Sequence, residues 1–245
     1  MTRTTKSLSG PTIEALRGPV HTGFNTRTED LVTSAFVLAL QALSGQSDFI
    51  LDTESHGRAD TLDIANMAPA IGWFTAYFPI GVSAAPSGDA IVTLKTVKED
   101  LRKVPNHGIG FGLARYWQKK TDCLPTMQPD ILLNYLGSIG HKHDQTDALK
   151  LIRLEETNLR ADQNNRSHAL EVNVFFLDET LQIVASHVGT APATALVENL
   201  LDQFDHHMQT LVNAVMQDQN TGFTPSDFPD AGLDQDELDA FLEGL

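Results

Sequence analysis

The sequence predicts an α/β fold in which a mixed β-sheet is flanked by helices. Two observations support this prediction: segments with helical apolar periodicity alternate with short apolar or β-rich runs, and the later part of the chain turns mostly to strand. Elements in such alternation are expected to bury their apolar faces as helices packed on a sheet. The strands are expected near 49–53, 130–136, 169–176 and 180–186, and the main packing helices near 29–43 and 192–216.

The helices are predicted from apolar spacing and from the residues that end them. Glu29 to Leu43 has apolar residues at 31, 32, 35, 36, 39, 40 and 43, and Ser44-Gly45 ends this stripe. Pro192 to Met216 is a long helix with a proline near its first turn. Further helices are expected over 90–103, from the glycine-rich segment after Pro105 to about Lys120, and over 234–242.

The strands are predicted from apolar and β-branched runs. Phe49 to Leu51 is bounded by two aspartates, so Glu54 is expected just past the end of a buried strand, where α/β proteins often place their sites. Trp73 to Val82 is expected to be a strand that Pro79 interrupts. Asp130 to Leu136 is almost continuously apolar, as in a central strand. The runs 169–176 and 180–186 predict a hairpin.

Composition excludes several classes of function. With 245 residues, 41% of them hydrophobic, the chain can bury a proper core. Its net charge of −15 argues against nucleic acids and anionic membranes as partners. No apolar run approaches a membrane span of about 18 residues, and the N-terminus lacks the apolar stretch of a signal peptide. Its single cysteine, Cys123, fits a reducing compartment, so a cytoplasmic location is expected.

Two short segments differ from ordinary packing patterns, namely Asp52-Thr-Glu-Ser-His-Gly-Arg58 and Ile71-Gly-Trp-Phe-Thr75. By spacing alone, Glu54, His56 and Arg58 form a polar turn after a strand. A carboxylate can also act as an acid or base if burial raises its proton affinity. Gly57 would allow a sharp turn of the backbone, and Arg58 can either orient a neighbouring carboxylate or hold the loop.

These segments resemble the motifs of epimerization domains, which belong to the condensation-domain superfamily of nonribosomal peptide synthetases. Those domains read Glu-Gly-His-Gly-Arg-Glu and Val-Gly-Trp-Phe-Thr. Pro105-Asn-His-Gly-Ile-Gly-Phe-Gly112 is similar to a third motif, Pro-x-x-Gly-x-Gly-Tyr-Gly, and Leu133-Asn-Tyr-Leu-Gly137 to a fourth, Phe-Asn-Tyr-Leu-Gly. The resemblance extends from about Pro19 to Phe228.

The resemblance implies a chloramphenicol-acetyltransferase-like half-domain. It divides the chain into an N-terminal lead-in at 1–28, a C-terminal subdomain of a condensation or epimerization domain at 29–230, and an acidic linker or helix at 231–245. It implies Glu54 as the catalytic acid or base, and it places the substrate-binding role on His56, Arg58, Trp73, Asn134 and Tyr135. Asn134 alone also fits a satisfied core amide, and Trp73 also fits plain core packing.

The chain departs from the family pattern at several positions. Ser55 replaces a glycine, which would strain the loop by roughly 1 kcal/mol if that position needs a positive φ. Ala59 replaces the second glutamate, and Asp60 is a displaced candidate for that acid. Phe111 replaces the usual tyrosine. These departures bear on activity more than on family.

The resemblance covers only the second half of a two-half domain. The family's His-His-x-x-x-Asp motif lies in the first half, and His206-His207 lacks the following Asp and Gly and falls inside an expected helix. Inversion of an α-carbon needs a base on one face and an acid on the other. We therefore expect the chain to be inactive without its N-terminal half.

The partners that the resemblance implies are that N-terminal half and a peptidyl carrier protein, whose phosphopantetheine arm carries an aminoacyl or peptidyl thioester. No directly bound cofactor or metal is expected. Two alternatives stay open: a condensation subdomain that forms peptide bonds, and a non-catalytic module that docks a carrier protein.

Overall fold

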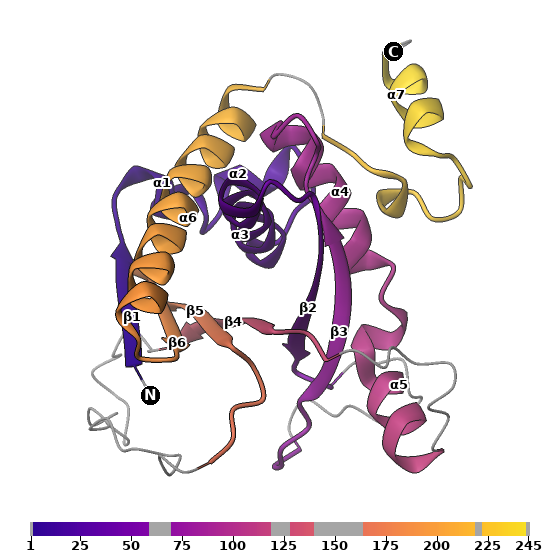
Figure 1. Ribbon diagram of the computed structural model, residues 1–245. Helices are drawn as coiled ribbons and strands as arrows, with labels where there is room; N and C mark the ends of the chain where they lie inside the picture. Colours follow the sequence, from indigo (N-terminus) through magenta and orange to yellow (C-terminus); the bar gives the residue numbers. More distant parts are fainter. Residues whose placement is uncertain (1, 59–69, 119–127, 140–163, 219–221, 244–245) are drawn as a thin grey trace, which may run out of the picture.

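The computed structural model describes residues 2–58, 70–118, 128–139, 164–218 and 222–243. Strands in the described residues form one six-stranded mixed sheet in the order β1-β6-β5-β4-β2-β3 (Figure 1). The strands are β1 (Thr2–Leu8), β2 (Asp48–Ser55), β3 (Ala76–Ser83), β4 (Ile131–Ile139), β5 (Leu170–Leu177) and β6 (Thr180–His187). Strand β4 runs parallel to both β2 and β5, and the remaining neighbours are antiparallel. The predicted α/β class with a mixed sheet is confirmed.

The described helices are α1 (Pro11–Ala15), α2 (Pro19–Thr22), α3 (Thr28–Ser44), α4 (Ala90–Arg102), α5 (Ile109–Gly112), α6 (Ala191–Gln217) and α7 (Gln235–Glu243). Most of them lie on one side of the sheet, whereas α5 lies beside the edge strand β3 and α7 lies apart from the sheet (Figure 1). Helix α3 contacts both α4 and α6, and α6 also contacts β1 and β6. The core therefore lies between α3, α6 and the helix-facing side of the sheet, where Phe36, Leu51, Val174 and Phe204 are almost completely buried.

Apolar spacing explains why the main helices form and end where they do. Helix α3 buries an apolar stripe that includes Leu31, Ala35 and Phe36, and it ends at Gly45, whose φ of 71° is in the left-handed region that favours glycine. Thr190 caps α6 by accepting a hydrogen bond from the Ala193 backbone N–H. The predicted helices at 29–43, 90–103, 192–216 and 234–242 are confirmed within two residues at each end.

The predicted strands are confirmed in place, with two corrections. Strand β2 continues through Glu54 and Ser55 because β3 pairs with it along its whole length, so Glu54 lies inside a strand and faces Tyr77. Strand β3 begins only at Ala76, which leaves Trp73 outside it, and Pro79 does not interrupt it. Proline is tolerated there because β3 is an edge strand.

Other elements were missed or lie partly outside the described residues. No strand was predicted for residues 2–8, yet β1 pairs with β6 along its full length. The helix expected to reach Lys120 is described as α5 followed by a π-helical turn, Leu113–Trp117. Ala59, Asp60 and Cys123 lie outside the described residues.

Candidate functional site

A cavity of about 440 Å³ opens where β2 ends, beside the middle of its parallel neighbour β4. Ligands of α/β proteins commonly bind beyond the carboxyl ends of such strands. The lining residues come from the end of β2, from the middle of β4, from the start of α3, and from the loops before β3 and after α4. They are Arg27, Glu29, Glu54, Ser55, His56, Thr75, His107, Asn134, Tyr135, Leu136 and Gly137.

Glu54 and Asn134 form the polar centre of this cavity. The side-chain amide of Asn134 donates a hydrogen bond of 3.0 Å to Oε2 of Glu54. Asn134 is buried at 5% exposure, and Glu54 is half-buried. The predicted alternatives for Asn134, a satisfied core amide or a site group, are thus combined, because the glutamate that satisfies the amide lines the same cavity.

The loop after β2 is shaped by Gly57. Its φ of 61° is left-handed, as expected for the sharp turn. Nδ1 of His56 accepts a hydrogen bond of 3.0 Å from the Arg58 backbone N–H. The exposed His56 ring then lies at the cavity wall, with its centroid 6.5 Å from that of His107.

Arg58 and Trp73 do not line the cavity. The Arg58 guanidinium donates to the carbonyl oxygens of Ala70, at 2.7 Å, and Gly72, at 3.2 Å, and it lies over the Phe74 ring. These contacts match the second predicted role of Arg58, which is to hold the loop. Trp73 is 87% exposed, so its predicted core alternative is wrong, because it precedes β3 and is not packed.

Gly57→Ala is expected to lower the free energy of unfolding by about 1–3 kcal/mol, because a Cβ there would overlap the Phe74 carbonyl oxygen and strain a positive φ. Urea denaturation measures this change. Gly112→Ala is the matched control, since its added Cβ has no other atom within 4 Å and its φ is −61°. Equal losses for both variants would show that Gly57 does not shape the loop as described.

Ser55 causes none of the strain considered for it. It pairs with Ala76 inside β2, and its φ is not positive. Its hydroxyl donates a hydrogen bond of 2.7 Å to the carbonyl oxygen of His107. His107 has a φ of 51°, an uncommon conformation that in other proteins gathers near functional sites. The serine therefore helps to fix the segment that carries His107 to the cavity.

Three lining residues with titratable side chains were not predicted from the sequence. Arg27 and Glu29 come from the start of α3, and His107 comes from the glycine-rich motif. Burial and the neighbouring charge of Asp30 raise the pKa of Glu29. Burial also raises the pKa of Tyr135, which lies close to Thr28 and Glu29. The only local signal for Glu29 was its place in a first helical turn, where an acidic residue is ordinary.

A second polar cluster is formed by Asp52, Tyr77 and His168, and its Asp52 lies two residues before Glu54 in β2. Tyr77 donates a short hydrogen bond to Asp52, and Nε2 of His168 lies 2.8 Å from Oδ2 of Asp52 and 2.7 Å from the Tyr77 oxygen. Burial and the hydrogen bond to Asp52 raise the pKa of Tyr77. Asp52 and His168 are buried. The hydrogen bonds of this cluster join the segment before β5 to β2 and β3.

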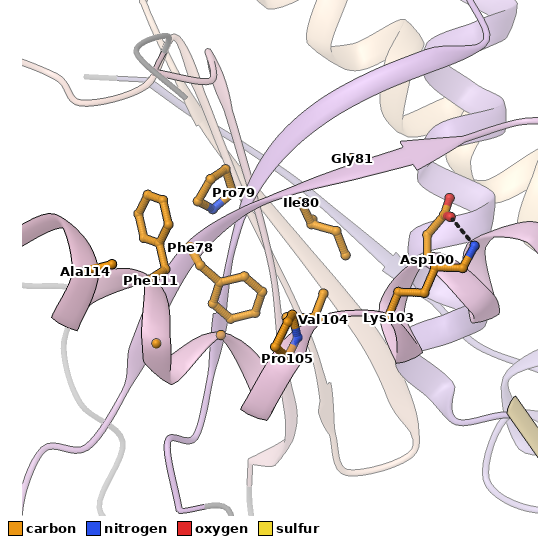
Figure 2. Close-up of a pocket in the computed structure, with 12 residues that line it drawn as sticks. Phe78, Pro79, Ile80, Gly81, Asp100, Lys103, Val104, Pro105, Phe111 and Ala114 are labelled. Carbon is orange, nitrogen blue, oxygen red and sulfur yellow. Dashed lines mark ion pairs between the residues drawn. The ribbon is translucent and has the colours of Figure 1, made fainter. Parts of the chain in front are cut away.

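A larger cavity of about 520 Å³ lies between β3 and the segment from α4 to α5 (Figure 2). Its wall is mostly apolar and includes Phe78, Pro79 and Phe111. The ion pair between Lys103 and Asp100, at 3.7 Å, lies at one side. Asp100 and Lys103 are the only ionisable groups among its described lining residues, and they pair with each other, so the Glu54 cavity is the better candidate site.

His206 and His207 lie inside helix α6, as the sequence predicts. His206 is exposed, whereas His207 is half-buried and burial lowers its pKa. Within the described part of the chain, no group of three or more His, Cys, Asp or Glu side chains is arranged to hold a metal. No described helix is both long and apolar enough to cross a membrane.

Comparison with known protein families matches residues 2–233 to the Condensation domain. Surfactin synthase subunit 1 of Bacillus subtilis (strain 168) is 29% identical over 240 residues, which make up 97% of this chain and 7% of that protein. Tyrocidine synthase 2 of Brevibacillus parabrevis is 28% identical over 242 residues, or 98% of this chain and 7% of that protein. The chain thus spans only a small part of these relatives.

Two solved structures extend the comparison. The epimerization domain from the third module of tyrocidine synthetase B is similar with a TM-score of 0.77 and 25% identity, over 89% of this chain and 49% of that one. PapA2 acyl transferase has a TM-score of 0.59 at 15% identity, over 89% of this chain and 45% of that one, and this likeness shows the fold alone. In both cases the chain corresponds to about half of the solved structure.

Proposed function

The chain belongs to the condensation-domain family, and on that premise we propose that it is the Glu54-bearing half of an epimerization domain. The observation that carries the proposal is the Glu54–Asn134 pair in a cavity at the end of β2. Its support is the agreement of four sequence motifs with those of epimerization domains, together with the similarity to a solved one. The substrate would be an aminoacyl or peptidyl thioester in nonribosomal peptide synthesis.

Glu54 would act on the α-hydrogen of the thioester. Its carboxylate takes the proton as the C–H bond breaks, and the electron pair moves toward the thioester carbonyl to give an enolate-like intermediate. The hydrogen bond from Asn134 fixes one carboxylate oxygen and so orients the group. Inversion is complete when an acid on the opposite face returns a proton to carbon. The family resemblance assigns that acid to the N-terminal half.

The thioester would arrive on the phosphopantetheine arm of a carrier protein. The cavity volume of about 440 Å³ is within the range of about 300–1,000 Å³ that small-molecule sites usually have. Asn134 and His56 can supply polar groups near a developing oxyanion, which is where such groups lower a reaction barrier most. No further cofactor or metal is part of this proposal.

A second candidate, a non-catalytic docking module, is favoured by one observation. Trp73 and Trp117 are 87% and 84% exposed, and large aromatic side chains in that state are frequent at protein interfaces. Condensation is the alternative within the family, since the family match by itself does not separate it from epimerization. A single assay can separate all three.

In this assay the chain is mixed with the N-terminal half of the solved epimerization domain in deuterated buffer. Donor and acceptor carrier proteins are loaded with a panel of L-amino acids. We expect the donor acyl group to gain one deuterium by mass spectrometry without forming an amide. A dipeptide on the acceptor would instead establish condensation, and carrier binding with neither product would establish docking.

The 245 residues alone are expected to give no measurable inversion of the α-carbon. A carbanion without an enclosed second acid would rely on water to return a proton to its opposite face, and half of the wall that excludes solvent would be absent. The same assay without the N-terminal half, read by the chirality of the released acid, measures this. Rapid inversion by the chain alone would show that the second proton carrier lies within these residues.

A further inference from the structure

Glu29 is an acidic residue that lines the Glu54 cavity and that the proposed chemistry does not use. It lies in the first turn of α3, and its side chain lines the cavity together with Glu54 and Asn134. The two residues beside it in the chain have partners elsewhere. The Thr28 hydroxyl donates to the Leu16 carbonyl oxygen, and the Asp30 carboxylate accepts a hydrogen bond from Arg102. Glu29 therefore differs from its neighbours in facing the cavity.

The carboxylate of Asp30, next to Glu29 in the chain, has hydrogen-bond donors for both of its oxygens. Both of its oxygens accept hydrogen bonds of 2.8 Å from Arg102, and Oδ2 also accepts one of 2.6 Å from the Arg27 backbone N–H. No comparable hydrogen bond or close ion pair to the Glu29 carboxylate is found among the described residues. Arg27 and Arg102 act on Glu29 only through longer-range attraction.

The result is a half-buried carboxylate that no cation of the described residues pairs with at close range. Burial is the main cause of its raised pKa, the charge of Asp30 adds to it, and the two arginines offset it only partly. A cation that enters the cavity would replace the lost hydration and pair with the free carboxylate. The cavity is thus prepared for a positively charged group near Glu54.

The two substrate classes differ in whether they carry a cation that could pair with Glu29. In an aminoacyl thioester the α-carbon carries both a free ammonium group and the hydrogen that Glu54 would remove. In a peptidyl thioester that nitrogen is a neutral amide. A cavity that holds both the base and a counter-ion for the ammonium therefore fits the first substrate class.

We propose that Glu29 binds the α-ammonium group of the substrate, so that this cavity takes aminoacyl thioesters in preference to peptidyl ones. This inference rests on the proposed function and deepens it, because it selects between the two substrate classes. Glu29 is then a specificity-determining residue, while Glu54 keeps the role of base.

The test uses two soluble probes, the N-acetylcysteamine thioesters of alanine and of N-acetylalanine. They differ in the charge of one nitrogen, and their binding to the full chain is measured by calorimetry. We expect Glu29→Gln to weaken binding of the alanyl probe about ten-fold or more, and to change binding of the N-acetylated probe less than about two-fold. Glu198→Gln, an exposed carboxylate of α6 that does not line the cavity, is the matched control.

The outcomes separate this inference from the proposal beneath it. If the wild-type chain binds both probes equally, or Glu29→Gln weakens both alike, the ammonium assignment is overturned and the epimerization proposal stands. If methylammonium chloride competes as strongly as the alanyl probe, Glu29 is a simple cation site and the assignment is also overturned. Binding of neither probe overturns it as well, whereas failure of the deuterium assay alone overturns the epimerization proposal.

Discussion

Asp227→Ala is expected to lower the free energy of unfolding by about 3–5 kcal/mol. The Lys98 ammonium is 1% exposed and lies 2.5 Å from the Asp227 carboxylate, which is 6% exposed. Its other partner is the carbonyl oxygen of Phe24, at 2.8 Å. Removing Asp227 leaves a buried positive charge without a counter-ion, and it also releases Asn25, which donates to the same carboxylate.

The pH dependence of the variant adds a second readout. Burial already lowers the pKa of Lys98 although Asp227 opposes that shift. Without Asp227 the pKa of Lys98 in the folded state should fall further. Between this lowered pKa and the ordinary lysine pKa, the unfolded state then holds a proton on Lys98 that the folded state has lost. The free energy of unfolding should therefore rise with pH through the window between the lowered and the ordinary value.

Urea denaturation at several pH values measures both effects. Asp230→Ala, an exposed acid three residues later, is the control and should change stability by less than about 0.5 kcal/mol. Combining Asp227→Ala with Lys98→Met removes the buried charge and should recover part of the loss. If Asp227→Ala lowers the free energy of unfolding no more than the control does, the buried ion pair does not stabilise the fold as described.

Glu54→Gln is expected to slow α-hydrogen exchange by the reconstituted domain about 10²–10⁴-fold. Glutamine keeps the size of the side chain, and its oxygen can still accept the hydrogen bond from Asn134. The loss would therefore reflect basicity and not packing. Deuterium incorporation under single-turnover conditions measures the rate, with unchanged urea denaturation as the folding control. A rate within about three-fold of wild type would exclude Glu54 as the base.

Most of the fold could be predicted because its signals are local. Helices α3 and α6 follow from apolar spacing, β4 from a continuous apolar run, and the β5–β6 hairpin from two β-rich runs around a turn. Strand β1 was missed because its residues are polar and become a strand only by pairing with β6 at the sheet edge. The far end of β2 was missed for a similar reason, since β3 extends it.

The site was predictable where a motif carries its own geometry. Glu54, His56, Asn134 and Tyr135 were predicted as site residues and line one cavity, although their roles stay predictions. Arg58 and Trp73 belong to the same motifs, yet the loop turns them away from the cavity. Glu29 and His107 reach the cavity only through packing of distant segments. The bond between Asp52 and His168 spans 116 residues and gives no local signal.

The most direct test of the central claim is the configuration of the product. Carrier proteins loaded separately with the L- and D-forms of an amino-acid panel are incubated with the chain and an N-terminal half, and the released acids are resolved by chiral chromatography. For at least one member, both forms should reach the same D-to-L ratio, and neither should do so with Glu54→Gln. If every acid keeps its starting configuration, the chain is not half of an epimerization domain.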